Sequence, residues 1–149
     1  MIEELNKKDI NQIMDIWLKE NKRTHNYISE EYWDNHFEDV KKEILKAEIY
    51  VYKEKEEIYG FIGLSSTYIA GIFVKKEKQS MGIGRKLIQY CKSKYPELML
   101  SVYEKNERAI AFYEIEEFKI VKEEIDKTTN EKEYVMVWKR GIKLWKIKN

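Results

Sequence analysis

The stretch that decides the fold spans residues 68–88 and has the sequence YIAGIFVKKEKQSMGIGRKLI. Its apolar start predicts a strand over 67–74 that is buried on both faces in the middle of a sheet. Gly71 inside this strand indicates a bulge or a close backbone approach. A charged loop follows, and helical spacing of apolar residues begins at Ile83. The stretch therefore predicts a buried strand, a glycine-containing loop and an amphipathic helix in succession.

Gly82 and Gly84 lie where the loop meets this helix, and they stand out because the chain has only 6 glycines. Such a loop leaves main-chain N–H groups unpaired, lets an oxygen ligand approach closely and adds the positive end of the helix dipole. Arg85 and Lys86 oppose that dipole but suit a polyphosphate. The glycine pair alone leaves two interpretations open, a phosphate-binding loop and a tight turn that needs both glycines.

Two other phosphate-binding motifs are disfavoured by the same residues. A P-loop requires a second glycine followed by Lys-Ser or Lys-Thr, and the chain has no such sequence. The dinucleotide fingerprint requires a third glycine at position 87, which is Leu87. An ATPase or a nucleotide-binding oxidoreductase is therefore not favoured.

The regions around the stretch alternate between strand and helix periodicity. Expected strands lie at 2–5, 49–52, 58–65, 98–103, 118–123 and 134–138, and expected helices at 6–20, 29–47, 83–95 and from Asn106 onward. Residues 21–28 have no clear period and are expected to form a connection, and residues 126–132 a hairpin loop. Hairpins dominate the middle and the end, so the fold class is α/β (α+β mixed): a mixed, mostly antiparallel sheet of six to seven strands flanked by about four helices.

Composition bounds the class of protein. The chain has 149 residues, 43% hydrophobic and 37% charged, which fits one globular domain with a heavily charged surface. Its net charge is +1, so a general polyanion-binding surface is not expected and nucleic acid is not the expected partner. The positive charge of the basic residues in 139–149 is offset by an excess of acidic residues in the rest of the chain. We expect a domain at 1–140 and a basic tail at 141–149.

Cysteine content and hydropathy suggest the compartment. Cys91 is the single cysteine, which excludes an intramolecular disulfide and a cysteine-rich zinc site, and no metal is expected. No apolar run approaches the ~20 residues of a membrane span, and the start lacks the apolar core of a signal peptide. These features predict a cytoplasmic protein without a membrane partner.

Two motifs together resemble the GNAT superfamily of acetyl-CoA-dependent N-acetyltransferases. The N-terminal helices with the His-Asn-Tyr-Ile segment at 25–28 also resemble a bacterial subgroup of small stand-alone acetyltransferases. The first motif is the strand and loop with Gln79, Gly82 and Gly84, which matches the pattern Gln/Arg-x-x-Gly-x-Gly/Ala. The second is LMLSVYEKNERAIAFYEIEEFKIV at 98–121, in which the matching residues are Asn106, Ala109, Phe112, Tyr113 and Phe118. Glu117 departs from the pattern, because the family usually has glycine there, and this puts the local turn geometry in question.

The resemblance implies a GNAT fold and transfer of the acetyl group of acetyl-CoA to a primary amine by direct attack in a ternary complex. It assigns Tyr113 as the general acid toward the coenzyme A thiolate. It assigns cofactor binding to Ile72, Phe73, Val74, Gln79, Met81, Gly82, Ile83, Gly84, Arg85, Lys86 and Asn106. Structural roles stay open beside these: core packing for the strand side chains and Tyr113, and helix capping for Asn106.

The acceptor side is less defined. His25, Tyr68 and Tyr103 are the candidates to contact the acceptor, and no residue is identified as the base. His25 has two interpretations, a proton acceptor or a solvated loop histidine. A small-molecule or peptide amine is the expected acceptor, for a monomer or a homodimer. The alternative function is a non-catalytic acyl-CoA-binding or regulatory module on the same fold.

Overall fold

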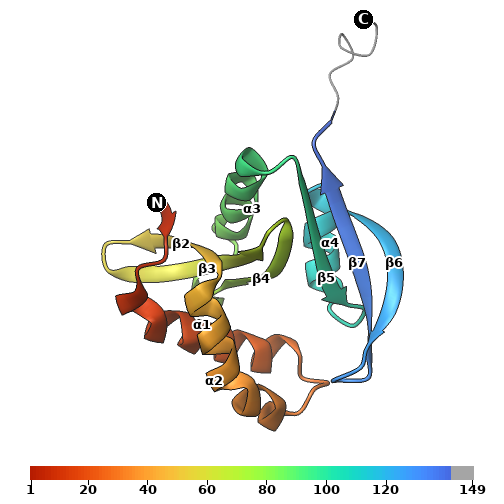
Figure 1. Cartoon of the computed structure of the whole chain (residues 1–149), viewed down its shortest axis with the longest axis horizontal. Coiled ribbons are helices and arrows are strands. Elements are labelled where there is room, and N and C mark those ends of the chain that lie inside the picture. Colours follow the sequence, from red (N-terminus) through yellow and green to blue (C-terminus); the bar gives the residue numbers. More distant parts are fainter. Residues whose placement is uncertain (142–149) are drawn as a thin grey trace, which may run out of the picture.

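One sheet with the strand order β1-β2-β3-β4-β5-β7-β6 forms the centre of the molecule (Figure 1). The computed structural model describes residues 1–141. The strands are β1 (Ile2–Glu4), β2 (Glu48–Glu54), β3 (Glu57–Ser65), β4 (Tyr68–Val74), β5 (Glu97–Tyr103), β6 (Lys119–Asp126) and β7 (Glu131–Lys139). The helices are α1 (Ile10–Thr24), α2 (Glu30–Lys46), α3 (Ile83–Lys94) and α4 (Glu107–Ile115), with 3-10 turns at Lys7–Asp9 and Lys76–Lys78.

The predicted order of elements and the mixed, mostly antiparallel sheet are confirmed. Only β4 and β5 pair in parallel among the described strands. None of the helices within residues 1–141 is long and apolar enough to cross a membrane. The basic tail expected at 141–149 lies outside the described residues, apart from Gly141.

Two apolar layers cover the two faces of the sheet. Side chains alternate along a strand, so Ile49 and Val51 pack with α1 and α2 while Tyr50 between them packs with α3. The inward stripe of α1, with Ile13 and Met14, is fully buried, as is that of α3. Trp17, Trp33, Cys91 and Trp138 are all buried in these layers.

The centre of the sheet is split between β4 and β5. The two strands pair only at Tyr68–Met99 and Ile69–Leu100 and then diverge (Figure 1). The prediction that β4 is buried on both faces is wrong: Ile69 is buried, but Ala70 is exposed and residues 71–74 are half-buried. The apolar side chains of β4 pack against the two apolar layers and also line an opening.

A bulge near Gly71 confirms the sequence expectation for this strand. The register passes from Gly63–Gly71 to Leu64–Ile69, so Ala70 is the extra residue on β4. A Cβ atom at position 71 would lie 2.5 Å from the Phe73 ring. Glycine is therefore required there for the ring to pack against the strand.

Helix α1 is longer than predicted. Residues 21–24 were expected in a connection, but the helix continues to Thr24. The polar groups of this last part bond within the helix: the Asn21 amide donates to the Trp17 carbonyl at 3.0 Å, and the Thr24 hydroxyl to the Glu20 carbonyl at 2.6 Å. Polar side chains satisfied in this way sustain a helix without an apolar period.

The turn after α4 explains why glycine would be expected at position 117. Glu117 has φ +73°, in the left-handed region. The Phe118 N–H donates to the Tyr113 carbonyl at 2.9 Å, and the Glu117 N–H to the Glu114 carbonyl at 3.0 Å. This is a left-handed helix end of the Schellman type. The chain forms the turn with a side chain present, and Phe118 is buried.

Candidate acetyl-transfer site

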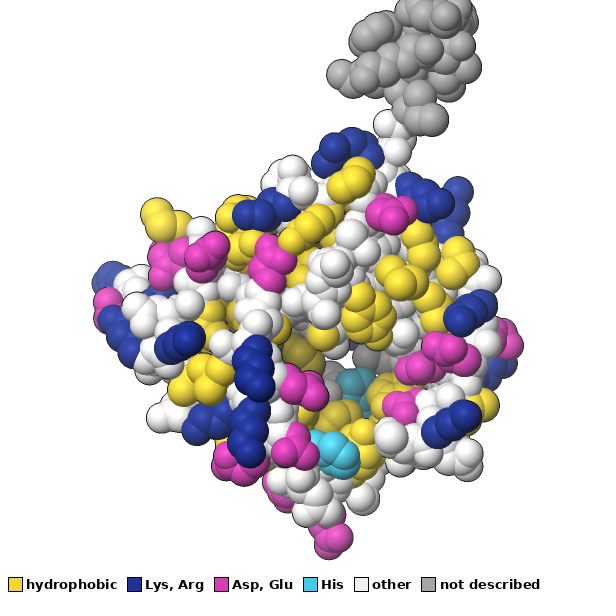
Figure 2. Space-filling view, in the orientation of Figure 1, with side chains coloured by type: hydrophobic (Ala, Val, Ile, Leu, Met, Phe, Trp, Pro, Cys, Tyr) yellow, Lys and Arg dark blue, Asp and Glu magenta, His cyan; other side chains and the backbone are white. Residues whose placement is uncertain are grey.

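A cavity of about 710 Å³ lies where the sheet is split. It is lined by the end of α1, by β4, by the loop before α3, and by parts of β5, α4 and β7. Figure 2 shows this hollow near the middle of the face, with apolar side chains and a histidine inside it. The cavity therefore extends from the glycine loop before α3 to the carboxylates of Asp126 and Glu133 on the other side of the split.

The glycine loop presents an open helix N-terminus. Gly82 precedes α3 with φ +77°, and no atom lies within 4 Å of a Cβ built on it. The first-turn N–H groups of a helix lack partners within the helix, and those of Ile83, Gly84 and Arg85 belong to this turn. The Lys86 N–H already donates to the Gly82 carbonyl at 3.0 Å. The loop thus offers main-chain donors and a helix dipole to an anion.

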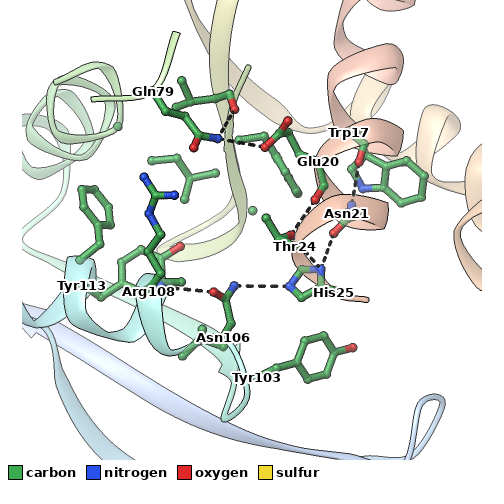
Figure 3. Close-up of a pocket in the computed structure, with 18 of the residues that line it drawn as sticks. Trp17, Glu20, Asn21, Thr24, His25, Gln79, Tyr103, Asn106, Arg108 and Tyr113 are labelled. Carbon is green, nitrogen blue, oxygen red and sulfur yellow. Dashed lines mark hydrogen bonds between the residues drawn. The ribbon is translucent and has the colours of Figure 1, made fainter. Parts of the chain in front are cut away.

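Gln79 fastens this loop to two neighbouring elements (Figure 3). Its amide nitrogen donates to the Val74 carbonyl at 2.9 Å and to Glu20 Oε1 at 3.0 Å. Glu20 is buried at the end of α1 and also binds Arg23. Sequence reasoning missed Glu20, although it lies three residues after Trp17 on the inward stripe of α1. The Gln79 side chain therefore sets the loop position through contacts with the protein.

Tyr113 lies on α4 in the wall of the cavity, and its ring packs on Phe112 and Phe118. Burial, with a smaller contribution from Tyr68, raises the pKa of the Tyr113 hydroxyl above its ordinary value. The hydroxyl consequently keeps its proton at neutral pH. Tyr113 therefore has both a packing role and a protonated group at the cavity.

His25 ends α1 and bridges the cavity toward α4 (Figure 3). Its Nδ1 lies 3.0 Å from Asn21 Oδ1 and its Nε2 lies 3.5 Å from Asn106 Nδ2, which makes Nδ1 the donor and Nε2 the acceptor. The ring stacks on Trp33 at 5.5 Å. Burial lowers the pKa of His25 to about 4, so the imidazole is neutral at pH 7. The interpretation as a solvated loop histidine is wrong, because the ring packs among aromatic side chains.

Acidic residues lie at the other end of the cavity, beside Tyr103. The Tyr103 hydroxyl donates to Asp126 Oδ2 at 2.7 Å, and Glu133 on β7 is the register partner of Tyr103 on β5. Both Asp126 and Glu133 line the cavity. Sequence reasoning missed them, because they lie in the β6–β7 hairpin, outside both motifs.

Most residues assigned from the sequence do meet at this cavity. Its lining includes His25, Tyr68, Ile72, Phe73, Val74, Gln79, Gly82, Ile83, Gly84, Arg85, Tyr103, Asn106 and Tyr113. Met81 and Lys86 are not part of the lining; Met81 is 54% exposed, and the Lys86 ammonium lies over the Tyr52 ring. The capping role of Asn106 is also present, since its side chain accepts from the Ala109 N–H at 3.3 Å.

The split sheet, the open helix N-terminus and the cavity with a protonated tyrosine suit an extended anionic ligand. The family model "Acetyltransferase (GNAT) family" matches residues 10–118, and the chain belongs to this family. It is therefore an acyltransferase, and acetyl-CoA is the donor that its family uses. The family and enzyme class expected from the two motifs are confirmed.

Two named relatives come from Escherichia coli strain K12. Peptidyl-lysine N-acetyltransferase YiaC is 31% identical over 140 residues, which cover 93% of this chain and 96% of that protein. Peptidyl-lysine N-acetyltransferase YjaB is 31% identical over 118 residues, covering 77% and 80%. The solution structure of apo YjaB matches with a TM-score of 0.82 at 25% identity, over 95% of this chain and 98% of that one.

A more distant structure supports the fold alone. The PaiA N-acetyltransferase of Thermoplasma acidophilum, solved in complex with coenzyme A, matches with a TM-score of 0.77 at 20% identity. The match covers 93% of this chain and 98% of that one. At this identity the likeness shows that the two chains share a fold.

Proposed function

We propose that this acetyltransferase transfers the acetyl group of acetyl-CoA to a primary amine by direct attack in a ternary complex, and that its acceptor is a lysine side chain in a peptide or protein. The observation that carries the proposal is the cavity itself. The open N-terminus of α3, Tyr113 and the acidic end around Glu133 all line one continuous space. Donor and acceptor therefore have room to meet without a covalent enzyme intermediate.

The donor half of the cavity fits a pantetheine arm with a pyrophosphate. Beyond Ile69, the edge of β4 that faces β5 is unpaired, which leaves main-chain groups free to pair with amides of the arm. The N–H groups of the α3 start and the open space above Gly82 suit the pyrophosphate. Arg85, which lines the same cavity, adds positive charge. The bound donor supplies the activated acetyl thioester.

The acceptor half suits an alkylammonium group. Its walls include the rings of His25, Trp33 and Tyr103, and its carboxylates belong to Asp126 and Glu133. Apolar rings can cover an aliphatic chain, and carboxylates attract its charged end. The names of YiaC and YjaB, which describe them as peptidyl-lysine N-acetyltransferases, support the same acceptor class for this chain.

Tyr113 is the proposed proton donor to the leaving thiolate. Its hydroxyl remains protonated at neutral pH and its ring is held by packing on α4 and Phe118. A group positioned in this way contributes typically about 10²-fold or more to the rate.

A thiol-release assay tests the function. Purified enzyme is mixed with acetyl-CoA and a panel of amines, which includes a lysine peptide with a blocked N-terminus, a free peptide N-terminus and a polyamine. We expect free thiol and acetylated product with the lysine peptide. Absence of release with every amine would refute the proposed function, and release only with another amine class would refute the lysine acceptor.

A further inference from the structure

Glu133 differs from the other carboxylates that line the cavity, because it alone has no bound partner within residues 1–141. Glu20 binds Arg23 and Gln79. Asp126 accepts from the Tyr103 hydroxyl and from both the N–H and the hydroxyl of Thr128. The Glu133 carboxylate makes no hydrogen bond or ion pair in the described part of the chain, although the side chain is half-buried.

The sheet places Glu133 in a row of side chains across three strands. Its register partners are Tyr103 on β5 and Glu124 on β6. Like charges directly opposite each other destabilise a sheet pair. Glu124 is exposed, and its own charge is compensated by Lys122 at 3.5 Å. The charge of Glu133 has no such partner in this row. A carboxylate kept in such a place at a cost to stability indicates a functional role.

The charges around Glu133 favour its protonated form. Burial raises the pKa of Glu133, and Asp126 and Glu124 raise it further. Two nearby lysines are engaged elsewhere: Lys132 pairs with Glu104 and Glu123, and Lys105 pairs with Glu131. Arg108 on α4 lines the same cavity, and it makes no ion pair with Glu133 within residues 1–141. From the α1 end, the rings of His25 and Tyr27 contact the Tyr103 ring, and His25 is neutral. An incoming cation would therefore be the counter-charge that Glu133 lacks.

We propose that Glu133 is a further catalytic residue, which binds the ammonium group of the acceptor at this end of the cavity and takes its proton. This inference rests on the proposed function. A lysine ammonium, with a pKa of about 10.4, must lose a proton before it can attack the thioester. A carboxylate whose proton affinity is increased by its surroundings is a better acceptor for that proton than one stabilised as the anion.

The other titratable groups of the cavity are less suited to this step. The hydrogen bonds to Asp126 lower the pKa of its carboxyl below the ordinary value despite burial. His25 has a pKa of about 4, and both its ring nitrogens already face amide groups. Glu20 is held between Arg23 and Gln79. Glu133 is the remaining group with a free carboxylate.

The proton and bond changes balance as follows. One proton passes from the ammonium to Glu133, and the neutral amine forms the N–C bond while the C–S bond breaks. The sulfur leaves with the electron pair of that bond and takes a proton from Tyr113. The second proton lost by the nitrogen restores Tyr113, and the proton on Glu133 leaves to solvent. The amide product keeps one hydrogen on nitrogen, and no oxidant or reductant takes part.

The test is the pH dependence of kcat/KM for the blocked lysine peptide in Glu133→Gln. We expect about a 10²-fold loss at pH 7, in the range for one proton-transfer group. The loss should shrink toward pH 10, where the peptide amine deprotonates without help. The acetyl-CoA Kd from calorimetry should not change. The melting temperature should be at least that of the wild type, because the variant removes a like-charge pair.

Two neighbouring variants serve as matched controls. Glu124→Gln removes a charge that raises the pKa of Glu133, so the acidic limb of its kcat/KM profile should move to lower pH while activity is retained. Glu123→Gln removes the charge of a residue that pairs with Lys132, and its profile should match the wild type.

A wild-type profile in Glu133→Gln would overturn the proton-acceptor role, and so would a deficit that stays constant from pH 6 to about 10, which marks a purely structural effect. In both cases the wild-type enzyme is active and the proposed function stands. A wild-type enzyme that releases no thiol with any amine would overturn the proposed function itself, and the Glu133 role with it.

Discussion

Replacing Gly82 by Asn and by Asp tests whether a phosphate group binds at the start of α3. Gly82 has φ +77°, and Asn and Asp are the residues with side chains that tolerate this region best. No atom lies within 4 Å of a Cβ at this position, so either side chain fits into open space. The two variants have nearly the same shape and differ by one negative charge. Their difference in donor affinity therefore isolates electrostatics from strain.

The expected magnitude follows from Coulomb's law. A unit charge about 5 Å from a phosphate charge is repelled by ~1 kcal/mol in water and by ~3 kcal/mol at the effective dielectric constant of about 20 near a protein surface. Gly82→Asp should therefore bind acetyl-CoA about 5-fold to about 150-fold more weakly than Gly82→Asn. The gap should narrow as salt is raised, because the position is exposed to solvent.

Calorimetric titration of both variants with acetyl-CoA measures the difference, and thermal melting without ligand confirms that they are equally folded. Equal Kd values for the Asn and Asp variants at low salt would refute the placement of a phosphate beside Gly82. A gap that does not depend on salt would show that the side-chain shape, and not its charge, affects binding.

Three further predictions concern catalysis and stability. Tyr113→Phe should lower kcat by about 10²-fold and leave the acetyl-CoA Kd unchanged, with Tyr90→Phe on α3 as the control; unchanged kcat would exclude the general-acid role. The pKa of His25 is about 4 in the folded state and about 6.5 in the unfolded state. Between these two pH values the unfolded state therefore binds more protons than the folded state. Stability measured in urea should be fully present above pH 6.5 and fall by up to about 3 kcal/mol toward pH 4, and His25→Gln should remove this dependence. Glu117→Gly should stabilise the fold by about 0.5–1 kcal/mol and raise the melting temperature by a few degrees, since it relieves a left-handed backbone; a lower melting temperature would contradict this.

The donor half of the site is predictable from the sequence because its signals are local. Gly82 directly precedes an amphipathic helix, Gly84 lies in the first turn of that helix, and Gln79 lies three residues before Gly82. A loop between a strand and a helix places such residues together whatever the rest of the chain does. The sequence could not show that β4 lines an opening, because an apolar strand has the same pattern in a core and in a cleft wall.

The acceptor half depends on contacts between distant parts of the chain. Asn106 and His25 are 81 residues apart, and Tyr103 and Asp126 come from different strands. A histidine after a helix has no periodicity, so its stacking on Trp33 and its lowered pKa follow only from the fold. The same holds for Glu133, which occurs in the hairpin sequence among several other charged residues.

The two halves are also coupled through the end of α1. Glu20 holds Gln79, which positions the loop before α3, and the next residue, Asn21, holds His25, which reaches Asn106 at the start of α4. A shift of α1 by one residue would therefore displace both the donor loop and the acceptor wall. Because these contacts come from adjacent residues of one rigid helix, the distance between the two halves is set by helix geometry. The aperiodic, polar sequence at 20–25 is thus as important to the site as either of the two motifs, although it resembles no motif itself.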